Sequence, residues 1–198
     1  MRRVLVTGFE PFHQSSSNPS EAIVHELAQM KIPELYCEVL PVVFGESAEI
    51  LLSKIVEIEP EIVMGLGQAE GRSQITPERV AVNLDDARIA DNKGEIPSDR
   101  EIVVGGANAH FTSLPVKEIV EVLSAKSIPA ALSMSAGTFV CNHLFYRMQE
   151  FCGPRGIKSG FIHLPLMESQ AKEFPGLPTL PLATMVEGIA LAIEVSRR

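Results

Sequence analysis

The sequence predicts an α/β fold: a three-layer sandwich in which a mostly parallel, twisted open sheet has helices on both faces. Short apolar runs of strand length alternate along the chain with longer segments of helical periodicity. That alternation is typical of strand–helix–strand units, whose strands pair in parallel. The 198 residues are 45% hydrophobic and 21% charged, and we expect them to form a single domain over 1–198.

Strands are expected where apolar or β-branched residues run together and are followed by glycine, proline or polar residues. The first, 3–9, leads into a polar loop over 10–17, which should lie at the carboxyl end of that strand. The third, 61–67, is apolar throughout, as expected of a strand buried on both faces. The expected strands are 3–9, 36–43, 61–67, 78–83, 128–134 and 161–166, with a hairpin around Gly105-Gly106.

Helices are expected where apolar residues recur at a spacing of three and four. Asn18 before Pro19 is a typical helix start, because asparagine caps the free N–H groups and proline fits the first helical position. The proline-rich stretch 168–181 is not expected to be regular. The expected helices are 19–30, 47–57, 116–126, 142–150 and 184–195.

Composition excludes several classes of function. A net charge of −8 without a dense basic cluster argues against a nucleic-acid-binding protein, and the apolar runs are too short to span a membrane. The spacing of Gly65, Gly67 and Gly71 does not match a dinucleotide-binding turn. Three cysteines without framework spacing, and a start that enters a strand directly, indicate free thiols in the cytoplasm.

Cys141 stands where a predicted strand turns into the predicted helix 142–150. Unpaired N–H groups and the helix dipole favour a thiolate at that place, which would suit a nucleophile. The alternative is a small buried cysteine without chemical function. Cys37 lies within a predicted strand, and Cys152 follows a helix end, where the dipole disfavours a thiolate.

A cysteine nucleophile needs a base within hydrogen-bond reach and a group that orients the base. His163 lies on a predicted strand, on the face opposite Ile162 and Leu164. It is a candidate base, or else a core histidine bonded to a backbone carbonyl. Glu78 begins a short predicted strand and would orient His163 if the two met, although a lone glutamate there is usually solvated.

Cys141, His143 and His163 also have the residue types of a metal site. However, Cys-x-His is not a common structural zinc spacing, and the sequence has no Cys-x-x-Cys pair. His143 is expected to point elsewhere on its helical turn. We therefore expect neither a metal nor a cofactor.

Five sequence blocks stand in order along the chain: Thr7–Phe12, Gly67–Arg72, Glu78–Asn83, Ser135–Asn142 and Phe161–Pro165. Together they resemble the pyroglutamyl peptidase I family, also called pyrrolidone-carboxylate peptidases. The resemblance runs from Val4 to the last predicted helix. It implies a cysteine peptidase that needs no cofactor, acts on peptides with an N-terminal pyroglutamate and is commonly a homotetramer.

By position, the resemblance implies that Cys141 is the nucleophile, His163 the general base and acid, and Glu78 the group that orients His163. The same correspondence implies a thioester acyl-enzyme. It also implies an oxyanion site made by Arg88 and the backbone N–H of Cys141.

The resemblance further implies a pyrrolidone pocket. Its walls would be Phe9, Phe12, Phe139 and Val140, and Gln68 would bind the lactam. Without the resemblance, a plug at the sheet edge is an equally good interpretation of one of the two phenylalanines of the first loop. A neutral lactam has no free amine, so apolar walls and a few hydrogen-bonding groups match its chemistry.

Glu70 stands where the family often has glycine, and we expect it to affect fine specificity. The apolar stretch 174–182 is a candidate subunit contact, or else a loop folded onto its own domain. Two other functions remain compatible with the residues: a binding protein that holds a lactam without turnover, and a thiol redox sensor that uses Cys141 alone.

Overall fold

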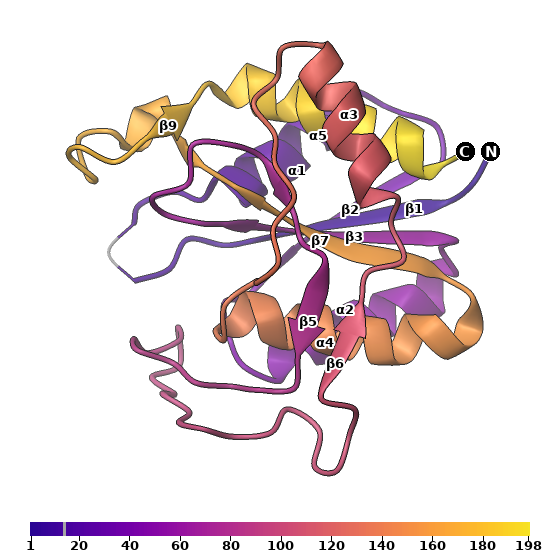
Figure 1. Ribbon diagram of the computed structural model, residues 1–198, viewed down its shortest axis with the longest axis vertical. Helices are drawn as coiled ribbons and strands as arrows, with labels where there is room; N and C mark the ends of the chain where they lie inside the picture. The colour runs from indigo at the N-terminus through magenta and orange to yellow at the C-terminus, as the bar shows by residue number, and fades with distance from the viewer. Residues whose placement is uncertain (14) are drawn as a thin grey trace.

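The computed structural model describes residues 1–13 and 15–198, and its centre is a five-stranded sheet (Figure 1). The strand order is β2-β1-β3-β7-β4, in which β4 is antiparallel to β7 and the other neighbours are parallel. Two small two-stranded sheets join β5 with β6 and β8 with β9. The strands are β1 (Val4–Phe9), β2 (Leu35–Leu40), β3 (Ile62–Gln68), β4 (Thr76–Pro77), β5 (Val80–Val82), β6 (Ala109–Phe111), β7 (Lys158–Leu164), β8 (Leu166–Met167) and β9 (Thr179–Leu180).

Helices cover both faces of the sheet, which confirms the predicted α/β class (Figure 1). One face is covered by α1 (Pro19–Gln29), α3 (Val116–Ala125) and α5 (Leu182–Ser196), and the other by α2 (Glu46–Ile58) and α4 (Val140–Cys152). Two short 3₁₀ turns, η1 (Gly153–Arg155) and η2 (Glu168–Gln170), complete the regular structure. No helix in the described ranges is long and apolar enough to cross a membrane.

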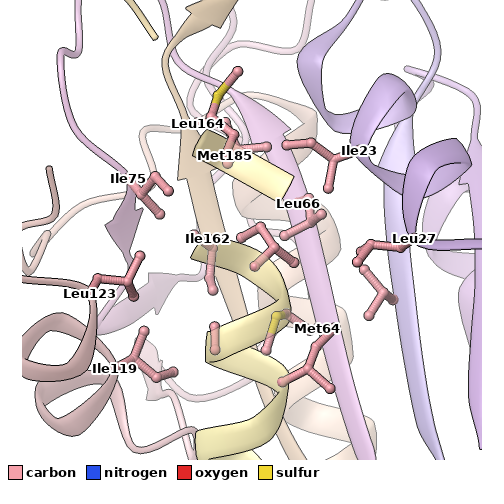
Figure 2. Close-up of a cluster of buried hydrophobic side chains, with 14 of the residues drawn as sticks. Ile23, Leu27, Met64, Leu66, Ile75, Ile119, Leu123, Ile162, Leu164 and Met185 are labelled. Carbon is pink, nitrogen blue, oxygen red and sulfur yellow. The ribbon is translucent and has the colours of Figure 1, made fainter. Parts of the chain in front are cut away.

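Alternation along β3 and β7 divides the core into two clusters. Met64, Leu66, Ile162 and Leu164 point toward α1, α3 and α5, where Figure 2 shows them among the aliphatic side chains of those helices. Phe161 points to the opposite face, toward α2 and α4. Because side chains alternate along a strand, His163 shares the face of Phe161, as the sequence predicted.

Two glycines of β3 make room on that second face for the ring of Phe161 in β7, and one of them also for Cys141 of α4. A Cβ added at Gly65 would lie 2.6 Å from the ring of Phe161. At Gly67 it would lie 2.8 Å from Sγ of Cys141 and 2.8 Å from the same ring. Glycine is therefore needed at both positions for sterics rather than for backbone conformation.

The predicted buried strand over 128–134 is wrong. The segment forms no continuous strand: it runs beside 75–79 through backbone hydrogen bonds and two isolated parallel bridges, from Ala130 to Ile75 and from Ser133 to Glu78. Leu132 is 36% exposed and Met134 63% exposed. The segment lies beside β4, which is the edge strand of the sheet, and has one side in solvent.

The predicted hairpin around Gly105-Gly106 is also wrong. β6 pairs instead with β5, which precedes the whole loop that contains Gly105 and Gly106. Between them, the amide of Asn83 bonds the backbone N–H and carbonyl of Val103, so a side chain supplies the contacts that a hairpin would have made. The other boundaries differ by a few residues: the second strand ends at Leu40 rather than 43, and 168–181 contains η2 and β9.

Candidate active site

A pocket opens at the carboxyl ends of β1 and β3, where the chain order of the sheet reverses. In an open α/β sheet this is the usual place for a ligand. β1 supplies Phe9, β3 supplies Gln68 and β7 supplies His163, while Cys141 comes from the start of α4. The residues lining the pocket are Phe9, Phe12, Asn18, Val42, Gln68, Ala69, Glu70, Arg72, Ala136, Gly137, Phe139, Val140, Cys141 and His163.

Cys141 is the second residue of α4, with Phe139 at the N-cap, and it is a free cysteine that is half-buried as a whole residue. Its Sγ lies against Gly67, which is the register partner of His163 in the neighbouring strand. Burial raises the pKa of the Cys141 thiol to about 12, and the charge of Glu78 adds to the rise. The charge of Arg72 and the backbone N–H of Cys141 oppose this rise without cancelling it, so the pKa of the thiol stays above its ordinary value.

His163 is 4% exposed, and its Nδ1 lies 2.8 Å from Oε1 of Glu78. The ring of Phe161 packs edge-on against it with centroids 4.9 Å apart. Burial lowers the pKa of His163, and the hydrogen bond and charge of Glu78 only partly oppose this effect. The ring is therefore neutral near pH 7, with its proton on Nδ1 facing the carboxylate and Nε2 left as an acceptor.

Glu78 is fully buried, so the alternative of a solvated glutamate is wrong. It lies between β4 and β5, and its backbone N–H donates to the carbonyl of Phe161 at 2.9 Å. Burial raises the pKa of Glu78, but the hydrogen bond from His163 and the charge of Arg72 oppose this effect, and the pKa lies below its ordinary value. The side chain is an ionised carboxylate beside a neutral imidazole.

Arg72 is a member of the site that sequence reasoning did not single out. Its Nη1 donates to Oε1 of Glu78 at 2.6 Å and also contacts Oγ1 of Thr76. Its Nη2 donates to the carbonyl of Ser135 at 3.0 Å. The side chain of Arg72 is 28% exposed and forms an ion pair with the buried carboxylate of Glu78. It also connects the loop after β3 to the segment before Cys141. Its presence in the block 67–72 was the only signal in the sequence.

The aromatic residues of the pocket differ in burial. Phe9 is 2% exposed and belongs to the core, with its ring 6.5 Å from that of Phe161. Phe12 is only partly buried, and its ring packs against Phe139 at 6.1 Å. Phe139 in turn meets the edge of Phe44 at 5.4 Å. Phe9 is therefore both a pocket residue and a plug, whereas Phe12 faces mainly the pocket.

Gln68 is 7% exposed at the end of β3. Its Nε2 donates to Oε1 of Glu70 at 3.3 Å, and its Oε1 accepts from Nε2 of Gln170 at 2.9 Å. Glu70 itself is exposed at the pocket rim. The lining side chains thus combine apolar walls with a small number of oriented polar groups, as in most small-molecule sites.

Arg88 is exposed and does not line the pocket that contains Cys141. It lines an adjacent hollow together with His13 and Asp86. That hollow shares several of its residues with the pocket, namely Phe12, Gln68, Glu70, Gly137 and Phe139.

His143 does not join Cys141 and His163. Its Nδ1 lies 3.0 Å from Oδ2 of Asp85, and its Nε2 accepts the backbone N–H of Gly45 at 3.3 Å. Both ring nitrogens are occupied within the protein, so the metal hypothesis loses one of its ligands. Within residues 1–13 and 15–198, no group of three or more His, Cys, Asp or Glu side chains is arranged to hold a metal ion.

The Asp85–His143 pair is a second feature that the sequence did not reveal. Asp85 is 1% exposed and also accepts from Arg100 at 3.2 Å. The ring of His143 meets Phe44 with centroids 5.8 Å apart. The pair therefore connects α4, just after Cys141, to the loop of Arg88 and to the aromatic wall of the pocket.

Comparison with known proteins gives a consistent result. The family model described as pyroglutamyl peptidase matches residues 2–198. A pyrrolidone-carboxylate peptidase of Vibrio vulnificus is 48% identical over 194 residues, which cover 96% of this chain and 91% of that protein. One of Bacillus cereus is 45% identical over 200 residues, which cover 99% and 93%.

Solved structures agree over the same length. The pyroglutamyl peptidase I of Bacillus amyloliquefaciens superposes with a TM-score of 0.94 at 41% identity, covering 98% of this chain and 94% of that one. A variant of the pyrrolidone carboxyl peptidase of Pyrococcus furiosus gives a TM-score of 0.94 at 40% identity, with 98% of each chain covered.

Proposed function

This chain belongs to the pyroglutamyl peptidase family, and on that basis we propose that it removes N-terminal pyroglutamyl residues from peptides with Cys141 as the nucleophile. One observation supports the proposal above all. Cys141 and His163 line the same apolar pocket, while Glu78 binds the nitrogen of His163 that lies away from it. A thiol and an imidazole in one pocket, the imidazole with an orienting carboxylate, are the groups that covalent catalysis requires, and this supports the proposal.

The first step begins with a protonated thiol, because burial raises the pKa of Cys141. As Sγ attacks the carbonyl carbon of the scissile amide, Nε2 of His163 takes the thiol proton and the carbonyl oxygen becomes an oxyanion. The carboxylate of Glu78 stabilises the imidazolium that forms, through the hydrogen bond to Nδ1. We propose that the backbone N–H of Cys141 and the guanidinium of Arg88 stabilise the oxyanion, with Arg88 entering from the adjacent hollow.

The intermediate then breaks down in two stages. The imidazolium of His163 gives its proton to the departing amine as the C–N bond breaks, which leaves a pyroglutamyl thioester on Cys141. Water next attacks the thioester while His163 accepts its proton. The C–S bond breaks, the thiol is restored, and pyroglutamic acid and the shortened peptide are the products.

The pocket lining explains why a pyroglutamyl group would be accepted. The lactam ring is flat and uncharged, and it lacks the ammonium of an ordinary N-terminus. Phe12, Phe139 and Val140 offer apolar surface, and Gln68 offers an amide for the lactam. A charged α-amine would lose its hydration among these residues without gaining an anionic partner other than Glu70 at the rim.

Release of a fluorescent amine from a pyroglutamyl conjugate by the reduced protein tests the proposal. Cys141→Ser should abolish release and keep the melting temperature, whereas Cys37→Ser should retain activity. Inactivation by iodoacetamide with full activity in EDTA is expected. Lactam binding without any turnover by the wild type would favour the binding-protein alternative, and reversible oxidation of Cys141 without turnover would favour the redox sensor.

We also propose that the protein assembles as a homotetramer, as its family commonly does, with the stretch 174–182 in a subunit contact. Leu177 in that stretch is 39% exposed. Light scattering that gives a monomer would overturn this assignment.

A further inference from the structure

Gln170, in η2, is a buried polar residue with no place in the proposed chemistry. Its side chain is 0% exposed, and its amide orientation is fixed by backbone groups. Oε1 accepts a hydrogen bond from the backbone N–H of Met167 at 2.8 Å, and a backbone N–H can only donate. Nε2 lies 3.1 Å from the carbonyl of Ser17, which can only accept, and 3.0 Å from Oγ of Ser15. A flipped amide would lose both backbone contacts.

The orientation of Gln170 determines the orientation of Gln68. The Nε2 of Gln170 lies 2.9 Å from the side chain of Gln68, which must offer its oxygen to this donor. The Nε2 of Gln68 then points the other way, toward Glu70, whose carboxylate accepts at 3.3 Å. Gln68 and Glu70 line the pocket and Gln170 does not, so the oxygen of Gln68 faces a residue outside the lining and its Nε2 faces one within it.

We propose that Gln170 is a positioning residue that holds Gln68 as a hydrogen-bond donor for the carbonyl oxygen of the substrate lactam. The proposal rests on the proposed function, because it assumes a pyroglutamyl ring in the pocket. A glutamine free to rotate would offer an oxygen or an N–H with similar ease. With Gln170 in place, rotation would bring two donors together and remove one from the lactam.

A donor fixed in this way would also discriminate between pyroglutamyl and prolyl rings, which have the same size. A prolyl residue has no ring carbonyl, and its nitrogen is a cationic donor at neutral pH. A fixed donor on Gln68 has no partner on such a ring, so binding would leave a buried N–H unpaired. The pocket is thereby expected to favour pyroglutamyl over prolyl peptides through Gln68, and Gln170 maintains that preference.

The test is a double-mutant cycle with Gln170→Met and Gln68→Met, which remove hydrogen bonding at similar side-chain length. Release of a fluorescent amine from pyroglutamyl and prolyl conjugates gives KM and kcat for each variant. Gln170→Met should raise KM for the pyroglutamyl substrate about tenfold and change kcat little, because the contact is equal in ground and transition states. In the Gln68→Met background, Gln170→Met should change KM less than twofold.

Ser15→Ala is the matched control, since it removes another partner of Gln170 without touching Gln68, and KM should stay unchanged. Gln68→Glu is the second variant: it retains an oxygen for Gln170, replaces the pocket-facing donor with an acceptor, and should raise KM more than Gln68→Met does. Gln68→Glu also keeps the proposal testable if circular dichroism shows that Gln170→Met is unfolded.

An unchanged KM for a folded Gln170→Met, or an equal rise in KM with and without Gln68, would overturn the positioning role. A Gln68→Glu variant with wild-type KM would overturn the donor role of Gln68. These outcomes require a wild type that turns over the pyroglutamyl substrate. A wild type without turnover would instead contradict the proposed function, so the two failures are distinguishable.

Discussion

Glu78 and His163 are 85 residues apart in the sequence, yet Oε1 of the glutamate lies 2.8 Å from Nδ1 of the histidine. The two side chains are 0% and 5% exposed, so their interaction is shielded from water. The same oxygen also binds Arg72 at 2.6 Å. One carboxylate oxygen therefore contacts both the base and a cation. Glu78 raises the pKa of His163 and Arg72 lowers it, and this balance modifies the larger effect of burial.

Replacement of the carboxylate tests this balance from one side. Glu78→Gln should lower kcat/KM about a hundredfold, because the imidazolium loses its counter-charge. The carboxylate raises the pKa of His163, so its removal should lower that pKa further. Since the neutral imidazole is the base, the acid limb of the pH profile of kcat/KM should move to lower pH. Glu49→Gln, at an exposed position of α2, is the control. An acid limb at wild-type pH would separate His163 from Glu78.

Replacement of the cation tests the same balance from the other side. Arg72 lowers the pKa of His163, so Arg72→Leu should raise that pKa and move the acid limb to higher pH. The direction is opposite to that of Glu78→Gln and distinguishes electrostatics from general damage to the site. Arg72→Lys, which keeps the charge, should give a smaller shift, and Lys117→Leu on α3 should give none. A shift of both Arg72 variants to lower pH would contradict this account.

The thiol of Cys141 should titrate differently from that of a cysteine peptidase whose nucleophile is already ionised in the free enzyme. Burial raises the pKa of Cys141 to about 12. Alkylation of Cys141 by iodoacetamide, followed by mass spectrometry, should accelerate with pH without a plateau below about pH 10. N-acetylcysteine gives the reference curve for an ordinary thiol. A plateau in rate near neutral pH would show a pre-formed thiolate and would contradict the protonated resting state.

The sequence predicted the order of the main strands and helices because each has a clear local pattern. The apolar run of β3, the Asn18 cap of α1 and the alternation around His163 all depend on near neighbours. The position of Cys141 at the start of α4 follows from the same local signals. These local patterns therefore predict the sheet and its helices, and the pocket opens at the carboxyl ends of the strands.

The sequence could not predict features that depend on distant contacts. Glu78 looked like a solvated residue because its burial arises only when β4 pairs with β7 and the segment before Cys141 passes alongside. The apolar residues of 128–134 predict a buried strand, because nothing in their pattern indicates that one side faces solvent. The place of Cys141 at a helix start follows from local signals, whereas the burial that raises the pKa of its thiol depends on distant contacts.

Two phenylalanines of the pocket should behave differently on truncation. Phe12→Ala should raise KM for a pyroglutamyl substrate about tenfold or more with a small change in melting temperature, because Phe12 is only partly buried and packs on Phe139. Phe9→Ala should lower the free energy of unfolding by about 3–5 kcal/mol, because Phe9 is 2% exposed in the core. Kinetics and thermal melts of both variants check this contrast. A large melting shift with unchanged KM for Phe12→Ala would make it a plug instead.

Gly67 determines how closely the nucleophile approaches the sheet. A Cβ at this position would lie 2.8 Å from Sγ of Cys141 and 2.8 Å from the ring of Phe161, so Gly67→Ala must displace one or both. Because Gly67 is the register partner of His163, the displacement falls between nucleophile and base. A shift of about 1 Å is enough to lower kcat about a hundredfold, while overpacking costs about 1–3 kcal/mol of stability.

The matched control for that substitution is Gly153→Ala, at a glycine where an added Cβ meets nothing within 4 Å and the backbone needs no left-handed conformation. It should leave both kcat and the melting temperature close to the wild type. Gly67→Ala with normal kcat, measured by release of the fluorescent amine, would mean that Sγ has room to move. The close approach of α4 to β3 would then be a packing feature without consequence for catalysis.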